Sequence, residues 1–320
     1  MYDDIMRKID NGSVLTKEDA IALLHIENTS DDFYRLLSKA NRLSRLHYEN
    51  KAYIFVQIGI NSAPCSGKCK FCSLSEDSFS VDLQFEKKAE QVEAEAKILS
   101  QENFDALFLM TTADYDRDKF LSIGKAVKKI ISPNVQLVAN IGDFDYDYAI
   151  RLKKSGFSGI YHVVRLREGT DTAIEKSERI KTLDAIKQAE LDLYYCVEPI
   201  GKEHTYEEIV DEMIRARDYN VDIMAIMGRV GVKGSAYNES NSLSEIELTK
   251  IAAVTRIVSN PKKSMCIHEP KPMALLAGIN QLYAEYGSNP RDNNADTIKN
   301  RGLNIESVKQ MLLDAEYVVC

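Results

Sequence analysis

Features that would indicate a membrane, secreted or nucleic-acid-binding protein are missing from this sequence. No apolar run among the 320 residues is long enough to span a bilayer, and the opening MYDDIMRKID contains no apolar core of a secretion signal. Acidic residues outnumber basic ones by 49 to 41, so the net charge of −8 offers no general positive excess for phosphate binding. We therefore expect a cytoplasmic protein whose main partner is neither a membrane nor a nucleic acid.

Six cysteines are present although nothing indicates export to an oxidising compartment. In a reducing compartment, cysteines serve metal binding or catalysis more often than disulfides. Cys65, Cys69 and Cys72 lie within eight residues, in the run APCSGKCKFCSL. A structural zinc site usually takes four ligands in two close pairs, and no second pair occurs here. Three crowded thiolates can instead ligate three irons of a four-iron cluster and leave the fourth iron open to a substrate or cofactor.

Short β-rich apolar runs alternate with amphipathic helical stretches along most of the chain. The sequence predicts strands at Tyr53–Ile60, Ala106–Met110, Val135–Asn140, Gly159–Leu166, Leu193–Glu198, Ile223–Val230, Ser264–His268 and Gln281–Tyr283. Eight strand–helix units in about 240 residues predict an α/β fold, a (β/α)8 TIM-type barrel. Functional residues of such barrels lie at the carboxyl ends of the strands, and the cysteine loop directly follows the first predicted strand.

Three regions are predicted from the same pattern. Residues 1–50 form an N-terminal helical extension, in which Thr16 and Asp19 carry a capping signature. Residues 51–287 form the barrel, and residues 288–320 form a polar, turn-rich C-terminal tail with one short helix.

The cysteine loop, with aromatic Phe71 before its last cysteine, resembles the CxxxCxΦC loop of radical S-adenosylmethionine (SAM) enzymes. From about residue 50 to 287 the chain also resembles biotin synthase, at YYCVEPIGKEH, RVGVKGSAY and LLAGINQLYAEYG. This resemblance implies anaerobic sulfur insertion that converts dethiobiotin, or a similar small molecule, to biotin. It further implies a SAM-binding four-iron cluster, an auxiliary iron–sulfur cluster as sulfur donor, and a low-potential electron donor such as ferredoxin or flavodoxin. A homodimer is a further expectation.

Three cysteines lie outside the loop: Cys196, Cys266 and Cys320. An isolated cysteine is most often a buried small hydrophobe, but Cys196 and Cys266 fall in predicted strands whose alternate side chains face the lumen. The resemblance places Cys196 at a family cluster ligand and Cys266 where the family has an arginine, while the other two family cysteines have no counterpart. We therefore expect these three cysteines to hold an auxiliary cluster, of four irons, with His268 as a candidate further ligand.

The resemblance also implies binding residues at the strand ends, and no catalytic side chain beyond the clusters. Arg165 would grip the SAM carboxylate through parallel hydrogen bonds, although a surface salt bridge is the plainer alternative. The residues expected to contact SAM are Phe71, Thr111, Thr112, Asn140, Arg165, Glu168, Glu198 and Ile200. Arg229 would bind the carboxylate of the substrate, and His162 and Met227 fall near positions where the family holds the ureido ring.

Two other functions remain open from the sequence. One is a different radical SAM reaction on the same scaffold, such as that of a methylornithine-synthase-like mutase or a hydrogenase-cofactor maturase. It predicts one four-iron cluster and no essential role for the three cysteines outside the loop. The other is a non-catalytic iron–sulfur or zinc protein, which predicts no SAM cleavage under reduction.

Overall fold

The computed structural model describes residues 2–238 and 241–319. Within these residues, eight parallel strands close into a barrel because the last strand, β10, pairs with the first, β1. This confirms the predicted (β/α)8 barrel. The strands, in their order around the barrel, are β1 (Lys51–Gly59), β4 (Ala106–Met110), β5 (Gln136–Asn140), β6 (Gly159–Tyr161), β7 (Asp192–Ile200), β8 (Ile223–Gly228), β9 (Ser264–His268) and β10 (Gln281–Tyr286).

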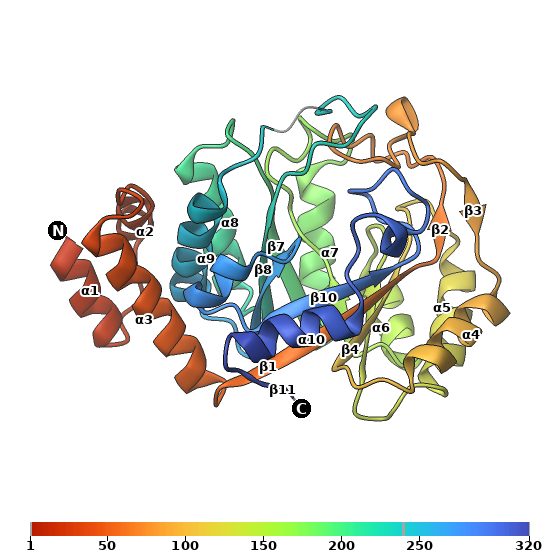
Figure 1. Ribbon diagram of the computed structural model, residues 1–320. Helices are drawn as coiled ribbons and strands as arrows, with labels where there is room; N and C mark the ends of the chain where they lie inside the picture. The colour runs from red at the N-terminus through yellow and green to blue at the C-terminus, as the bar shows by residue number, and fades with distance from the viewer. Residues whose placement is uncertain (1, 239–240, 320) are drawn as a thin grey trace.

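Helices surround the barrel (Figure 1). Their bounds are α4 (Ala89–Leu99), α5 (Arg117–Lys128), α6 (Tyr146–Lys154), α7 (Lys176–Gln188), α8 (Tyr206–Asp218) and α9 (Glu245–Ser259), and the short 3-10 helix η2 (Pro272–Ala277) joins β9 to β10. Packing between the helices is close: Phe120 stacks on Phe157 with ring centroids 5.1 Å apart. A Cβ atom added at Gly124 would lie 2.3 Å from the Phe157 ring, so only glycine lets this ring approach α5.

The first 50 residues contain three helices, α1 (Tyr2–Asp10), α2 (Lys17–Leu24) and α3 (Asp31–His47). Helices α2 and α3 lie against α8 and α9, and α1 packs on α2 (Figure 1). Thr16 and Asp19 form a reciprocal capping box at the start of α2, with hydrogen bonds of 3.2 and 3.1 Å. The buried Arg256 of α9 donates to the Ser44 hydroxyl of α3 at 2.8 Å. No helix in the described residues combines the length and the apolar composition needed to cross a bilayer.

The C-terminal segment returns to the barrel. Helix α10 (Ile305–Asp314) packs against β1 and β10, and strand β11 (Val318–Val319) pairs with Lys51 and Ala52 at the amino-terminal end of β1. A small hairpin, β2 (Asn61–Ser62) with β3 (Phe85–Glu86), flanks the loop that follows β1.

Aromatic side chains fill the middle of the lumen. The Phe108 ring lies 5.1 Å from Tyr194, 5.1 Å from Tyr283 and 5.5 Å from Phe55, centroid to centroid. All four rings are almost completely buried. The lumen is therefore a packed core at this level, and open space remains above it, toward the carboxyl ends of the strands.

Strand β6 is shorter than predicted, because it ends at Tyr161 and does not continue to Leu166. Beyond it the backbone finds side-chain partners: the Val164 N–H donates to the Tyr195 hydroxyl at 3.2 Å, and the Arg165 N–H donates to the Glu168 carboxylate at 3.0 Å. The first of these contacts is long-range and the second is local, and beyond the end of β6 Arg165 lies at the edge of the cavity described below.

Candidate active site

The cysteine loop is fixed to its surroundings by backbone hydrogen bonds. The Cys65 N–H donates to the Leu74 carbonyl at 2.8 Å, which closes the loop on itself. The Ser66 N–H donates to the Asp114 carboxylate at 2.7 Å, which ties the loop to the segment after β4. The loop is therefore held in place by the protein alone, before any cluster is bound.

All three thiols line one cavity. Gly67 lies beside two of them, since a Cβ atom added there would be in van der Waals contact with the Cys65 sulfur at 3.5 Å and the Cys69 sulfur at 3.7 Å. The Leu74 N–H donates to the Cys72 sulfur at 3.3 Å, a bond of the kind that tunes cluster sulfurs. Among the described residues, no three His, Cys, Asp or Glu side chains are spaced for a single metal ion, whereas a cubic cluster takes each thiolate on a different iron.

Burial raises the pKa of the Cys69 and Cys72 thiols above the ordinary value. Without metal, these thiols are therefore protonated at neutral pH. Iron supplies the positive charge that a buried thiolate needs, so binding of a cluster would release protons.

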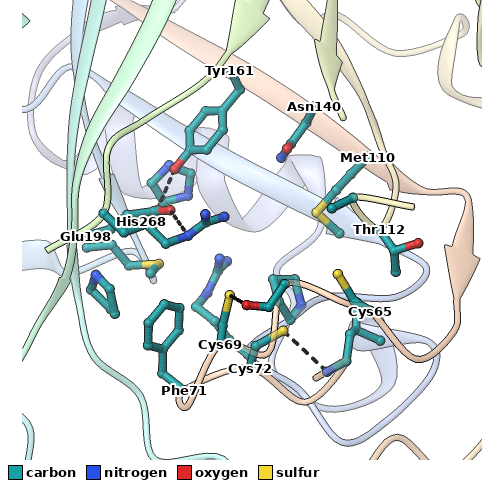
Figure 2. A pocket seen from close by; sticks show the side chains of 18 of the residues that line it. Cys65, Cys69, Phe71, Cys72, Met110, Thr112, Asn140, Tyr161, Glu198 and His268 are labelled. Carbon is teal, nitrogen blue, oxygen red and sulfur yellow. Dashed lines mark hydrogen bonds and ion pairs between the residues drawn. The ribbon is translucent and has the colours of Figure 1, made fainter. Parts of the chain in front are cut away.

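A cavity of about 140 Å³ lies at the carboxyl ends of the barrel strands, with the three cysteines on its wall (Figure 2). Of the sequence-predicted residues, nine more line it: Phe71, Thr111, Thr112, Asn140, Arg165, Glu198, Met227, Arg229 and His268. Five other predicted residues do not line the cavity: Glu168, Ile200, His162, Cys196 and Cys266. Cys320 lies outside the described residues. The binding roles of all these residues stay predictions, but the structure brings most of them to one place.

Arg165 lies between acidic groups at the cavity wall. Its Nε is 3.6 Å from the Glu198 carboxylate and its Nη1 is 3.7 Å from the fully buried Glu168 carboxylate. Burial lowers the pKa of Arg165, but Cys69 and the two carboxylates outweigh it and raise the pKa, so the guanidinium stays charged. Within the described residues Nη1 makes no hydrogen bond. This buried N–H group can donate a hydrogen bond to an anionic group placed in the cavity.

Glu198 also accepts a hydrogen bond of 2.6 Å from the Tyr161 hydroxyl (Figure 2). The bond fixes the carboxylate beside the cavity. Glu168 does not line the cavity and acts on it only through Arg165 and a second arginine, Arg179.

Threonines 111 and 112 differ in what they can offer a ligand. Thr112 is committed to Asn61, since its hydroxyl accepts at 2.8 Å and its N–H donates at 3.0 Å. The neighbouring Thr111 hydroxyl is buried and has no hydrogen-bond partner in the described part of the chain. The hydroxyl of Thr111 is therefore the one left available to a bound molecule.

Two arginines that sequence reasoning missed also line the cavity, Arg179 and Arg291. Arg179, from α7, places its Nε 3.3 Å from the Glu168 carboxylate. Arg291 donates to Glu269 at 2.9 Å and to Glu285 at 2.5 Å. Arg291 belongs to the polar tail, whose turn-rich sequence carries no periodicity that would have placed it over the barrel.

The remaining predicted substrate residues have different surroundings. Arg229 is paired with Glu203 through Nη2 at 2.9 Å, its guanidinium lies 4.3 Å from the Tyr237 ring, and its buried Nε has no hydrogen-bond partner in the described chain. His162 is directed to Asp143, 3.3 Å away, and lies outside the cavity wall.

His268 lies on the deep side of the cavity. Its ring stacks on Tyr283 with centroids 4.5 Å apart and meets the edge of Tyr161 at 5.6 Å. Burial lowers the pKa of His268 well below its ordinary value, and the Arg291 cation adds to the effect, so the imidazole is neutral.

Cys196 and Cys266 are brought together in the lumen. Cys196 of β7 pairs in register with Ala225 of β8, which pairs with Cys266 of β9, so the three side chains share the lumen face. Both cysteines are completely buried and neither forms a disulfide. Burial raises the pKa of both thiols well above the ordinary value.

Similarity to known proteins identifies the family. No protein family model matches the chain. A biotin synthase of Acetivibrio thermocellus is 24% identical over 317 residues, covering 93% of this chain and 97% of that protein. Another, of Clostridium acetobutylicum, is 25% identical over 294 residues, covering 87% and 89%. The chain is a biotin synthase-like member of the radical SAM superfamily.

Two solved structures superpose closely on the fold of this chain. Methylornithine synthase (PylB) superposes with a TM-score of 0.84 at 17% identity, over 99% of this chain and 97% of that one. The FeFe-hydrogenase maturase HydG from Carboxydothermus hydrogenoformans superposes with a TM-score of 0.82 at 16% identity, over 99% and 79%. At such identities these structures bear on the fold of this radical SAM protein and not on its substrate.

Radical SAM relatives imply a four-iron cluster and SAM, and the residues of this radical SAM protein fit both. The three loop thiols all lie on the wall of the cavity. The unpartnered Arg165 Nη1 and Thr111 hydroxyl are buried groups at the same cavity that a carboxylate and an ammonium would satisfy. Thr111 accepts through its oxygen and Arg165 donates, so the pair matches the two charged ends of an amino acid.

Proposed function

We propose that this radical SAM enzyme inserts sulfur into dethiobiotin to form biotin. The observation that carries the proposal is the juxtaposition of Cys196 and Cys266 in the lumen, beneath a cavity whose wall holds the cysteine loop. Relatives named biotin synthase that match nearly the whole chain support the substrate.

Different residues of the cavity would bind the cluster and SAM. Cys65, Cys69 and Cys72 would hold the four-iron cluster, while Arg165 and Thr111 would hold the amino-acid end of SAM. When bound, the cluster and SAM together supply the electron and the radical that remove hydrogen from the substrate carbon. The protein's task is then to position the substrate and to keep competing hydrogen donors away.

The cysteine loop, the C-terminal tail and three aromatic rings would keep water out of the cavity. The Ser73 N–H of the cysteine loop donates to the Pro290 carbonyl of the tail at 3.0 Å, so the two segments close over the cavity. The opposite side is made of the Phe108, Tyr161 and Tyr283 rings. A reactive carbon is thus enclosed by protein on both sides.

The sulfur would come from an auxiliary cluster held by Cys196 and Cys266, with Cys320 as the third thiolate. Ala225 lies between the two lumen cysteines in the strand register and has a small side chain. Arg229 would meet the carboxylate of dethiobiotin through its unpartnered Nε.

Iron counting and product analysis test this proposal. Wild type reconstituted without oxygen should convert dethiobiotin to biotin, detected by mass, when given SAM and reductant. A Cys65/Cys69/Cys72→Ala variant should retain the auxiliary iron, and a Cys196→Ser/Cys266→Ser variant should cleave SAM yet form no biotin. Absence of iron in the loop variant would contradict sulfur insertion.

A second candidate is a single-cluster radical SAM enzyme of the mutase or maturase type. Tyr161 and Tyr283 lie near Cys196 and, together with Phe108, pack the lumen there, which favours this alternative because an auxiliary cluster would need that space. In that case the double serine variant would keep full activity on its substrate, and all iron would be lost with the loop cysteines.

A further inference from the structure

Two polar side chains on the deep side of the cavity lack hydrogen-bond partners. These are the Gln57 amide Nε2 and both ring nitrogens of His268, none of which is bonded within the described residues. Gln57 is 4% exposed and His268 is 5% exposed. Unsatisfied buried polar groups are costly, so three such atoms facing one cavity indicate a ligand that satisfies them.

The order of the strands places Gln57 and His268 on neighbouring parts of the cavity wall. Gln57 lies on β1 and His268 on β9, on either side of β10. Between them stands Tyr283 of β10, on which the His268 ring stacks. Side chains on these strands alternate between the lumen and the outside, and the side chains of Gln57 and His268 both line the cavity in the lumen. Figure 2 shows His268 beside Tyr161, across the cavity from the loop cysteines.

The subsite formed by Gln57 and His268 offers an amide and an imidazole, and each of these groups can supply both a donor and an acceptor. The charged side chains of the cavity, in contrast, are already opposed by carboxylates: Arg179 by Glu168, and Arg291 by Glu269 and Glu285. The flanking Phe108, Tyr161 and Tyr283 rings offer apolar faces. The occupant therefore has an apolar body and a neutral head with both N–H and C=O groups.

We propose that Gln57 and His268 bind the neutral head of the substrate, a cyclic urea or amide, and that they determine substrate specificity. The inference rests on the proposed function, because it assigns the ureido end of dethiobiotin to these two residues. It also assigns His268 to the substrate rather than to an auxiliary iron.

Equilibrium dialysis of the reconstituted enzyme with SAM, without reductant, measures binding before turnover. The probes are dethiobiotin and decanoate, a straight-chain carboxylate without the ring. His268→Phe keeps a ring to stack on Tyr283, and Gln57→Leu keeps the bulk. Each should weaken dethiobiotin binding about 10- to 100-fold and leave the Kd of decanoate unchanged. His268→Gln, which restores a donor and an acceptor, should recover part of the affinity.

The matched control is Gln281→Leu, which removes another buried lumen amide; its Nε2 has no partner in the described residues, its Oε1 accepts from Ser264, and it does not line the cavity. Its dethiobiotin Kd should equal that of wild type, and iron content and SAM Kd should be the same in all variants. The inference is overturned if His268→Phe and Gln57→Leu bind dethiobiotin as wild type does, or if His268→Phe loses iron. Biotin formation by wild type is a separate readout, so failure of the proposed function is recognised independently.

Discussion

Replacing Arg165 with methionine tests how the cavity holds SAM. Removing one partner of a buried ion pair usually lowers the free energy of unfolding by about 3–5 kcal/mol. The loss should be smaller here, because both carboxylates that face Arg165 keep another partner. Glu168 retains Arg179 at 3.3 Å and Glu198 retains the Tyr161 hydroxyl at 2.6 Å. We therefore expect the smaller cost of a partly unsatisfied group, about 1–3 kcal/mol, measured by urea unfolding of the metal-free protein.

The same substitution should also weaken the binding of SAM. A hydrogen bond to a charged group contributes about 1.5–3 kcal/mol, which corresponds to a rise of about 10- to 150-fold in the Kd of SAM. Equilibrium dialysis on protein with a reconstituted cluster measures this Kd. Arg167→Met is the matched control, because Arg167 is two residues away but pairs with Glu208 at 3.0 Å and does not line the cavity. A SAM affinity of Arg165→Met within twofold of the control would refute the reasoning.

Three further predictions concern the scaffold. Gly124→Ala should lower the unfolding free energy by about 1–3 kcal/mol through overpacking, since the added Cβ would lie 2.3 Å from Phe157; an unchanged urea midpoint would contradict this. Thr16→Ala should cost about 1 kcal/mol by removing the capping box, visible as a lower Tm. Burial raises the pKa of Asp143, but hydrogen bonding to His162 outweighs it and lowers the pKa to about 2. Its stabilisation is thus complete above about pH 4 and lost as the pH falls toward 2; Asp143→Asn should flatten the stability profile in that window.

Much of the candidate active site could be predicted from local patterns in the sequence. The strands at Ala106–Met110 and Ser264–His268 fall where apolar β-rich runs indicate them, and alternation along a strand places Cys266 and His268 on one face. The spacing of the loop cysteines needed no tertiary information, because all three ligands lie on one short segment.

Residues placed by distant contacts could not be predicted. The predicted strand Gly159–Leu166 contains Arg165, yet β6 ends at Tyr161, and Arg165 lies beside Glu198, outside the sheet. Arg291 lies in a polar segment with no periodicity, and it pairs with Glu285 of β10, six residues before it, and with Glu269, 22 residues before it at the end of β9.

The central claim is that Cys65, Cys69 and Cys72 hold a four-iron cluster that cleaves SAM. The most direct measurement is chromatography of wild type and the Cys65/Cys69/Cys72→Ala variant, each reconstituted without oxygen and incubated with SAM and a low-potential reductant. We predict 5′-deoxyadenosine and methionine from wild type and neither from the variant. Intact SAM with brown, iron-loaded wild type, or equal cleavage by the variant, would contradict the account.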